Sequence, residues 1–185
     1  RGLWWYGLSG GGFHASSNQR KCTADERQAE EDSCHFLRPS WMIDHTAVRN
    51  RLGQWATFLY DMHGELTFAI AEGFANPGPK EHGYNGTDGW DQQLLGGANG
   101  EGTLLYPGRP DKIGGRTHIP VASLRLLMIR EGQEDFEWLK AAAQAAGRDR
   151  VVKAMAPVMT AAYNFTSDPQ PIWDTRAALA ELIAG

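Results

Sequence analysis

Two neighbouring stretches decide the fold that this sequence predicts: GGANGEGTLLYPG at residues 96–108 and IPVASLRLLMIREGQEDFE at residues 119–137. In the first stretch, closely spaced glycines favour a tight turn that leads into a short apolar strand. Pro107 and Gly108 are expected to end this strand, and a helix is expected to begin after Pro120. The two stretches therefore predict a turn, a strand, a polar loop and a helix in close succession.

Outward from this region, the chain alternates predicted strands and helices. Apolar residues at helical spacing predict one helix that begins at a cap, Asp44 or Thr46, and ends at Gly64; they are Val48, Leu52, Trp55, Leu59 and Met62. Buried strands are predicted at residues 3–8 and 66–71 and an extended piece at 104–106, with further helices at 121–130, 133–146, 148–163 and 174–184. A long polar loop is expected between Gly73 and Gly102. Strands that alternate with helices indicate a parallel α/β sheet, but a complete eight-stranded barrel needs about 250 residues.

Composition excludes several classes of function. The 185 residues carry a formal net charge of −4, so no basic excess exists to neutralise the phosphates of a nucleic acid. Apolar runs stay short of the roughly 20 residues that cross a bilayer, so no membrane partner is expected. The six His show no pair at metal-ligand spacing, so neither a metal nor another cofactor is expected.

Cys22 and Cys34 bracket a charged segment that contains few apolar residues. A disulfide between them would supply the constraint that the segment otherwise lacks, and it would imply an oxidising compartment and a secreted protein. Two unrelated thiols are the alternative. The sequence begins at Arg1 without Met or a signal-peptide pattern, so a fragment or a processed chain is expected.

Several pieces of the chain, in order, resemble one family. They are LWWY (3–6), the cysteine pair, WMIDHTAVRNR (41–51), GELTF (64–68), GGANGEGTLLYPG (96–108) and REGQEDFE (130–137). Together they resemble the C-terminal region of catalytic domains related to glycoside hydrolase family 123, grouped as domain of unknown function 4091. The resemblance covers about Leu3 to Leu139.

The resemblance implies the C-terminal part of a (β/α)8 TIM-type barrel that hydrolyses O-glycosidic bonds. Residues 1–147 would form this partial barrel, and residues 148–185 a helical tail packed on it. In such domains an adjacent Asp-Glu pair performs the chemistry, and that pair lies upstream of the region matched here. This chain is therefore expected to be inactive alone, to bind carbohydrate, and to depend on an N-terminal barrel half or another chain.

Candidate site residues lie where strands are expected to end. Glu72 follows the second predicted strand, at the edge where barrels place their active sites, so it is the candidate catalytic carboxylate; a solvated loop residue is the alternative. Trp90 and Asp91 offer a stacking face and a hydroxyl acceptor for a sugar. One of Trp5 and Tyr6 is expected to face the barrel interior and to contact substrate, although core packing would explain either ring equally well.

Asn99 is a weaker candidate for substrate binding, because an Asn among glycines also suits a left-handed backbone. The charged face of residues 125–137 is expected to consist mostly of solvated ion pairs, with Arg125 able to anchor the helix to barrel loops. Two further functions stay open. One is a non-catalytic carbohydrate-binding or structural module derived from such a barrel, and the other is a small α/β domain with no role in sugar binding.

Overall fold

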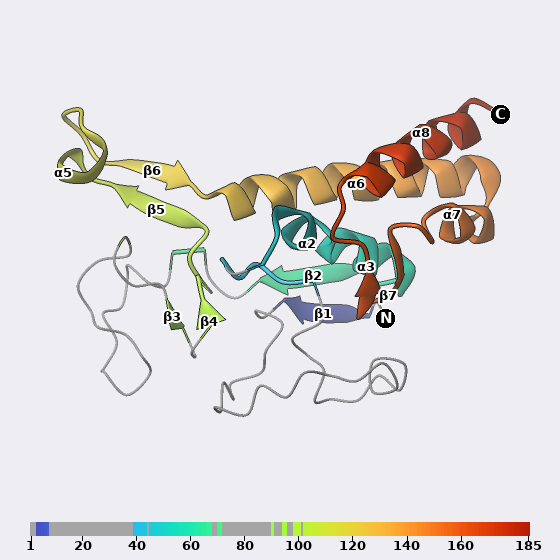
Figure 1. The fold of residues 1–185 in the computed structure, drawn as a ribbon, viewed down its shortest axis with the longest axis horizontal. Helices are drawn as coiled ribbons and strands as arrows, with labels where there is room; N and C mark the ends of the chain where they lie inside the picture. Colours follow the sequence, from blue (N-terminus) through green and yellow to red (C-terminus); the bar gives the residue numbers. More distant parts are fainter. Residues whose placement is uncertain are drawn as a thin grey trace.

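The fold is that of a computed structural model, which describes residues 3–7, 39–43, 45–67, 70–71, 90, 94–95, 98–100 and 102–185 (Figure 1). Its helices are α2 (Ala47–Arg51), α3 (Gly53–Leu59), α5 (Pro110–Ile113), α6 (Leu124–Ala146), α7 (Arg148–Ala154) and α8 (Gln170–Ala184). Its strands are β1 (Trp4–Gly7), β2 (Gly64–Thr67), β3 (Leu94–Leu95), β4 (Ala98–Asn99), β5 (Leu105–Gly108), β6 (Ile119–Ala122), β7 (Met159–Ala161) and β8 (Asn164–Phe165). The chain is thus a mixed helix and strand protein.

The described strands form four two-stranded sheets. β1 and β2 are parallel, with Trp4 opposite Gly64 and Tyr6 opposite Leu66. The other three sheets, β3–β4, β5–β6 and β7–β8, are antiparallel. The helices α2 and α3 precede β2 in the chain, as a crossover between parallel strands requires.

The helix α6 is the central helix of the helical layer. Ser123 caps its first turn by accepting a hydrogen bond from the amide of Leu126, at 3.2 Å. Figure 1 shows α8 running along one side of α6, with α2 and α3 beneath it. The apolar core lies among these helices, α7 and β7; its fully buried members include Leu52, Trp55, Leu139, Met155, Val158, Ile172 and Leu179. The burial predicted for Leu52 and Trp55 is therefore confirmed, but the single helix predicted to end at Gly64 is two helices, α2 and α3, and α3 ends at Leu59.

Gly132 explains why the two helices predicted at residues 121–130 and 133–146 are one. The prediction placed a break near Gly132, yet α6 continues through it for 23 residues. A Cβ at this position would lie 2.3 Å from the carbonyl oxygen of Arg51 and 2.4 Å from Oε1 of Gln54. The glycine therefore serves the close approach of α6 to α2 and α3, and the helix prediction was wrong at this point.

Several further boundaries differ from the sequence prediction. Pro107 and Gly108 do not end the strand but belong to β5, and Pro120 lies opposite Pro107 in β6. Residues 119–122 pair as a strand before α6 begins, so the helix starts three residues later than predicted. The helix predicted at 148–163 also ends early, because the chain turns back at residues 155–158 to form the β7–β8 hairpin.

The strands β1 and β2 were predicted to be buried, and for their described side chains this is wrong. Trp4 is 65% exposed and Leu66 is 54% exposed. Trp4, Gly64 and Leu66 share one face, since a Cβ at Gly64 would lie 2.6 Å from the Trp4 ring. The opposite face carries Glu65, whose carboxylate reaches Gln54 of α3. One face of the parallel pair is therefore covered by helices and the other exposes apolar side chains.

Candidate functional site at the strand ends

Arg125, in the first turn of α6, holds three separate segments together where the chain leaves the strands. Its side chain is 5% exposed. The guanidinium donates to the carbonyl oxygens of Trp41, at 2.8 Å, and of Gly100 and Thr103. It also reaches the hydroxyl of Tyr106, at 3.3 Å. Burial lowers the pKa of Arg125, and the interaction with Tyr106 partly opposes this. The anchoring role expected of Arg125 is confirmed.

The glycine-rich turn fits against this guanidinium because Gly100 has no side chain. Its φ is +82°, in the left-handed region that favours glycine. A Cβ there would lie 2.6 Å from Nη1 of Arg125 and 2.6 Å from Cγ1 of Ile43. Gly100 is therefore required twice, for its backbone conformation and for the approach of Arg125 to its carbonyl group.

The segment that follows β2 is tied to the same place. The carbonyl oxygen of Ile70 accepts from the amides of Leu104, at 2.8 Å, and Leu105, at 3.0 Å. Ala71 and Thr103 form an antiparallel bridge. The segment that follows β2 therefore lies beside the residues that leave the glycine-rich turn, and Glu72 is the next residue after this bridge. Glu72 itself lies outside the described residues.

Trp90 packs on the strand that leaves this turn. Its Nε1 donates to the carbonyl oxygen of Pro107, at 2.8 Å, and its ring lies 5.0 Å from the Tyr106 ring at an angle of 49°. The side chain of Trp90 is partly exposed. The hydroxyl of Tyr106 is in turn held by Arg125. Arg125, Tyr106 and Trp90 thus form a connected chain of contacts, which we call the strand-end site.

The remaining predicted site residues are placed in part or not at all. Trp5 and Tyr6 lie in β1 and Asn99 lies in β4, and the structure describes only their backbones. Asp91, like Cys22 and Cys34, lies outside the described residues. In the described part of the site, the structure therefore brings together Trp90, Tyr106 and Arg125; of these, sequence reasoning missed Tyr106, whose position in a short strand gave no sign of function.

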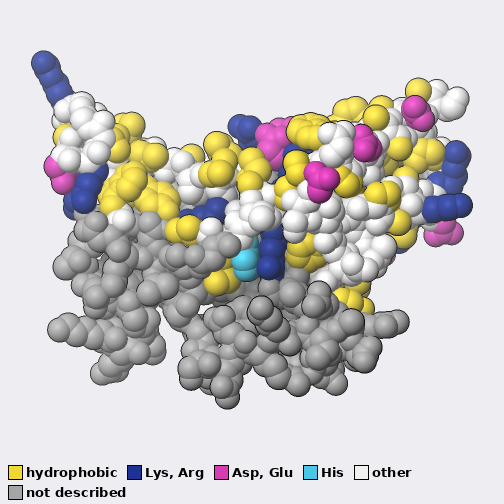
Figure 2. Space-filling view, in the orientation of Figure 1, with side chains coloured by type: hydrophobic (Ala, Val, Ile, Leu, Met, Phe, Trp, Pro, Cys, Tyr) yellow, Lys and Arg dark blue, Asp and Glu magenta, His cyan; other side chains and the backbone are white. Residues whose placement is uncertain are grey.

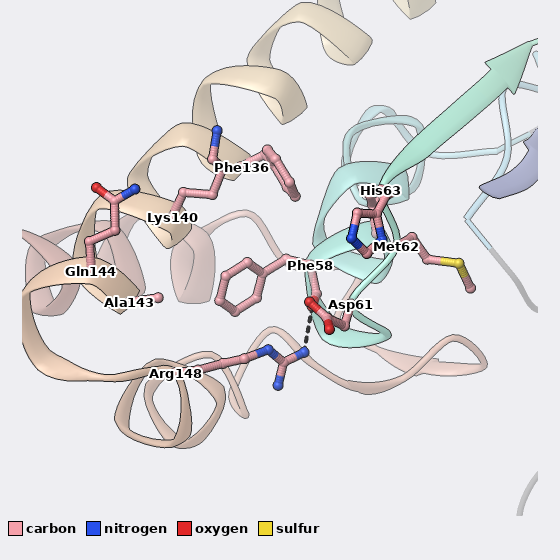
Figure 3. A pocket seen from close by; sticks show the side chains of 10 residues that line it. Phe58, Asp61, Met62, His63, Phe136, Lys140, Ala143, Gln144 and Arg148 are labelled. Carbon is pink, nitrogen blue, oxygen red and sulfur yellow. Dashed lines mark hydrogen bonds between the residues drawn. The ribbon is translucent and has the colours of Figure 1, made fainter. Parts of the chain in front are cut away.

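A pocket lies at the opposite end of β2 from the strand-end site (Figure 3). This pocket, of about 460 Å³, is lined by Thr57, Phe58, Asp61, Met62, His63, Phe136, Lys140, Ala143, Gln144 and Arg148. The amide of His63 donates to the carbonyl oxygen of Leu3, at 2.8 Å, so the pocket lies where β1 and β2 begin.

The charged groups of this pocket mainly support the fold. Arg148 donates to the carbonyl oxygens of Phe58, at 2.8 Å, and Leu59, at 2.9 Å, which satisfies the last turn of α3. Its guanidinium also lies 5.2 Å from the centre of the Phe58 ring. Lys140 pairs with Glu137 at 3.2 Å. Arg148 and Phe58 are 90 residues apart, so no local pattern in the sequence indicates that they meet.

Asp135 corrects the expectation that the charged face of α6 is mostly solvated. Its side chain is 0% exposed. One carboxylate oxygen accepts from Nε of Arg51, at 2.6 Å, and Nε1 of Trp55, at 2.9 Å. The other accepts from Nη2 of Arg51, at 2.8 Å, and Nε of Arg176, at 2.6 Å. All four contacts hold α2, α3, α6 and α8 together, so Asp135 has a structural role; Arg130, Glu134 and Glu137 are exposed, as expected.

Glu65 is a carboxylate with a raised pKa in an unexpected place. Burial raises its pKa to about 7, and the hydrogen bond from Nε2 of Gln54, at 3.1 Å, opposes the rise. Such a pKa suits an acid or base at neutral pH. However, Glu65 lies on the side of β2 that faces α3, and not at the end of the strand. It is therefore separate from the strand-end site.

The described residues include no group of three or more His, Cys, Asp or Glu side chains arranged to hold a metal ion. In the same part of the chain, no helix combines the length and the apolar character that crossing a membrane requires. Comparison with known proteins adds no assignment, since no protein-family model matches the chain and no curated protein matches it either.

Proposed function

We propose that this chain is the C-terminal part of a (β/α)8 glycoside hydrolase barrel of the family 123-like type, and that it contributes carbohydrate-binding loops. In the full-length protein, the barrel would hydrolyse O-glycosidic bonds with an Asp-Glu pair supplied by an earlier strand. The chain alone would bind sugar without cleaving it. Residues 1–147 would belong to the barrel region and residues 148–185 to the helical tail.

The observation that carries this proposal is the partly exposed ring of Trp90 at the strand-end site. Flat aromatic rings stack on the apolar faces of sugars, and such a ring must be held rigidly to select one orientation of the ligand. Trp90 is fixed by a hydrogen bond to Pro107 and by the ring of Tyr106. Tyr106 is fixed in turn by Arg125. This buried support is what a binding loop requires.

The different surroundings of the two faces of the β1–β2 pair support the proposal of a barrel. In a barrel, one face of each strand packs on helices and the other packs on side chains from the other strands. Glu65 faces α3, whereas Trp4 and Leu66 lie on the other face and are more than half exposed. Further strands would cover these two apolar side chains. They would come from an N-terminal barrel half or from another chain.

A non-catalytic carbohydrate-binding module is the second candidate. It is favoured by Thr67, the last residue of β2, because the resembled domains often carry aromatic residues in this strand. An Asp-Glu pair in a preceding barrel half, in the full-length protein or in a partner chain, would separate the two candidates. A catalytic Glu72 would make the chain itself active, whereas our proposal expects no turnover by this chain. A secreted protein with a Cys22–Cys34 disulfide fits either candidate.

Binding of neutral oligosaccharides by wild-type and Trp90→Ala protein tests the proposal. We expect Trp90→Ala to weaken binding about tenfold, the equivalent of about 1.4 kcal/mol. Trp138→Ala is the matched control, since Trp138 is a 39% exposed tryptophan on α6. A glycan array would choose the ligand, and calorimetry would measure both variants. If the wild-type protein binds no glycan, or if both variants bind equally well, the strand-end site is not a sugar site.

A further inference from the structure

The pocket at the beginning of β1 and β2 has apolar walls that include two phenylalanine rings. Its volume of about 460 Å³ lies in the roughly 300–1,000 Å³ range of small-molecule sites. The rings of Phe58, from α3, and Phe136, from α6, meet edge to face with their centres 6.3 Å apart. Figure 3 shows the α6 side chains on one side of the pocket and the residues that follow α3 on the other. The pocket therefore offers an apolar surface to a small ligand.

Arg148, at the start of α7, brings a positive charge to this pocket. Its Nη2 donates to the carbonyl oxygens of Phe58, at 2.8 Å, and Leu59, at 2.9 Å. Among the described residues, no carboxylate lies within ion-pair distance of Arg148, and no acceptor binds the N–H groups on its Nε and Nη1. Its charge and these donors are therefore available to a negatively charged group of a ligand.

Asp61 brings a negative charge to the same place. Its backbone amide donates, at 3.1 Å, to the carbonyl oxygen of Phe58 that Arg148 also contacts. Its φ is 54°, in the left-handed region where Asp and Asn are the commonest residues after Gly. In the part of the chain that the structure describes, its exposed carboxylate pairs with no cation, Arg148 included. Opposite charges thus meet beside one carbonyl oxygen without an ion pair between them.

Lys140, the second cation that lines the pocket, is balanced within its own helix. It pairs with Glu137 at 3.2 Å, and both side chains are largely exposed. Figure 2 shows Lys or Arg side chains and Asp or Glu side chains together at the end of the molecule where α7 lies. Because charges of both signs occur here, the surroundings do not select a simple anion or a simple cation. A ligand that carries both charges fits this pocket better.

From these contacts we infer that the pocket binds a free α-amino acid with an aromatic or large apolar side chain. The carboxylate of the ligand would accept from Arg148, its ammonium group would pair with Asp61, and its side chain would pack against Phe58 and Phe136. Hydrogen bonds between two charged groups are roughly twice as strong as those between neutral ones. The pocket is separate from the strand-end site, so this inference goes beyond the proposed function and does not depend on it.

Ligand-detected NMR titrations of the whole chain test the inference. The probes are L-phenylalanine, 3-phenylpropionate, which lacks the ammonium group, 2-phenylethylamine, which lacks the carboxylate, and glycine, which lacks the ring. Asp61→Asn removes the charge and keeps a residue that accepts the left-handed backbone. Its control, Glu181→Gln, removes an exposed carboxylate from α8 with the same change in net charge. Ala143→Leu fills the pocket, and its control, Ala145→Leu, adds the same atoms at an exposed position of α6.

We expect phenylalanine to bind with a Kd of about 1 mM or below, and each analogue to bind at least about fivefold more weakly, because each lacks one of the three contacts. Asp61→Asn should weaken phenylalanine binding about fivefold and change 3-phenylpropionate binding less than about twofold. Ala143→Leu should weaken phenylalanine binding about tenfold or more, and both controls should change it less than about twofold. Thermal melts establish that the variants fold. If Ala143→Leu does not fold, Asp61→Asn still decides the question, because an exposed change from carboxylate to amide has little effect on stability.

Several outcomes overturn the inference. Absence of saturable phenylalanine binding does so directly. Equal binding of 3-phenylpropionate would assign the pocket to simple anions, preference for 2-phenylethylamine would assign it to cations, and equal binding of glycine would exclude the ring contacts. Unchanged affinity in Asp61→Asn, or equal effects of Ala143→Leu and Ala145→Leu, would show that phenylalanine binds elsewhere on the chain. None of these results affects the proposed function, which is tested separately with neutral oligosaccharides and Trp90→Ala.

Discussion

The helical layer buries its apolar side chains, whereas the parallel strand pair β1–β2 leaves apolar side chains exposed. Around α6, the side chains of Leu139, Met155 and Leu179 are each 0% exposed. On the free face of β1–β2, Trp4 and Leu66 are 65% and 54% exposed. Both regions are rich in apolar residues, yet only the first encloses them.

The difference indicates how far the stability of each region depends on contacts with other parts of a larger protein. Helices that pack on one another can bury a continuous core within one chain, and an isolated pair of strands is marginal in water. The helical layer is therefore expected to fold and melt as a unit, whereas the exposed face of β1–β2 is expected to contribute little until other strands cover it. Substitutions in the two regions test this contrast.

The largest effect is expected for Asp135→Asn, at the centre of the helical layer. Loss of the carboxylate would leave Arg51 and Arg176 without their buried counter-ion, at a cost of about 3–5 kcal/mol in the free energy of unfolding. Urea denaturation followed by circular dichroism would measure it. Glu137→Gln, which removes an exposed carboxylate from the same helix, is the control and should change stability by less than about 0.5 kcal/mol. A cost below about 1 kcal/mol for Asp135→Asn would show that the buried pairs are not needed.

A matched pair of leucine truncations tests the contrast directly. Leu139→Ala should lower the free energy of unfolding by about 2–5 kcal/mol, because it leaves a cavity in the core. Leu66→Ala removes the same atoms from a half-exposed position and should cost less than about 1 kcal/mol. Thermal melts of both variants under one set of conditions suffice. If the two costs are equal, the free face of β1–β2 is buried in solution and the contrast disappears.

Gly132→Ala is expected to destabilise although alanine is the better helix former. The added methyl group would meet the carbonyl oxygen of Arg51, and we expect a net loss of about 2 kcal/mol after the roughly 1 kcal/mol gained in helix propensity. Gln133→Ala, at an exposed neighbour in α6, should be neutral or slightly stabilising. Chemical denaturation of the two variants would compare them, and a stabilised Gly132→Ala protein would contradict the close approach of the helices.

The smallest effect concerns the pH dependence at Glu65, where strand and helix meet. Its pKa rises from 4.5 to about 7 on folding, so the folded chain holds the proton more tightly than the unfolded chain. Stability from this group is full below pH 4.5 and is lost as the pH rises toward about 7. Glu65→Gln should remove this loss, so the variant should gain stability over wild type at pH 8 and little at pH 4. If the stability of the variant differs from that of wild type by the same amount at pH 4 and pH 8, Glu65 does not titrate between these values.

The sequence predicted what depends on local pattern. Helical spacing located Leu52 and Trp55 in the core, and the glycine-rich turn before a short strand was expected at the place where Gly100 and β5 lie. Arg125 was expected to anchor a helix to loops, and it does so. Periodicity and turn residues act between close neighbours, and this is why a single sequence contains enough information to predict them.

What the sequence did not predict depends on partners far along the chain. Gly132 suggested a helix break, because nothing near it reveals that α2 approaches that position. Asp135 resembled any exposed carboxylate, because its partners Arg51 and Arg176 are 84 and 41 residues away. Tyr106 gained its place in the strand-end site only through contacts with Arg125 and Trp90. In each case, contacts between residues far apart in the sequence determined the structure, and the local sequence pattern did not predict it.

The pairing of Asp135 with two arginines sets an order of events during synthesis. A ribosome makes the chain from its N-terminus, so Arg51 already exists when Asp135 appears, and Arg176 follows 41 residues later. At cellular elongation rates this interval lasts roughly 2–8 s. Until Arg176 has been made, only one of the two arginines that pair with Asp135 exists, and α8 is absent from the helical layer.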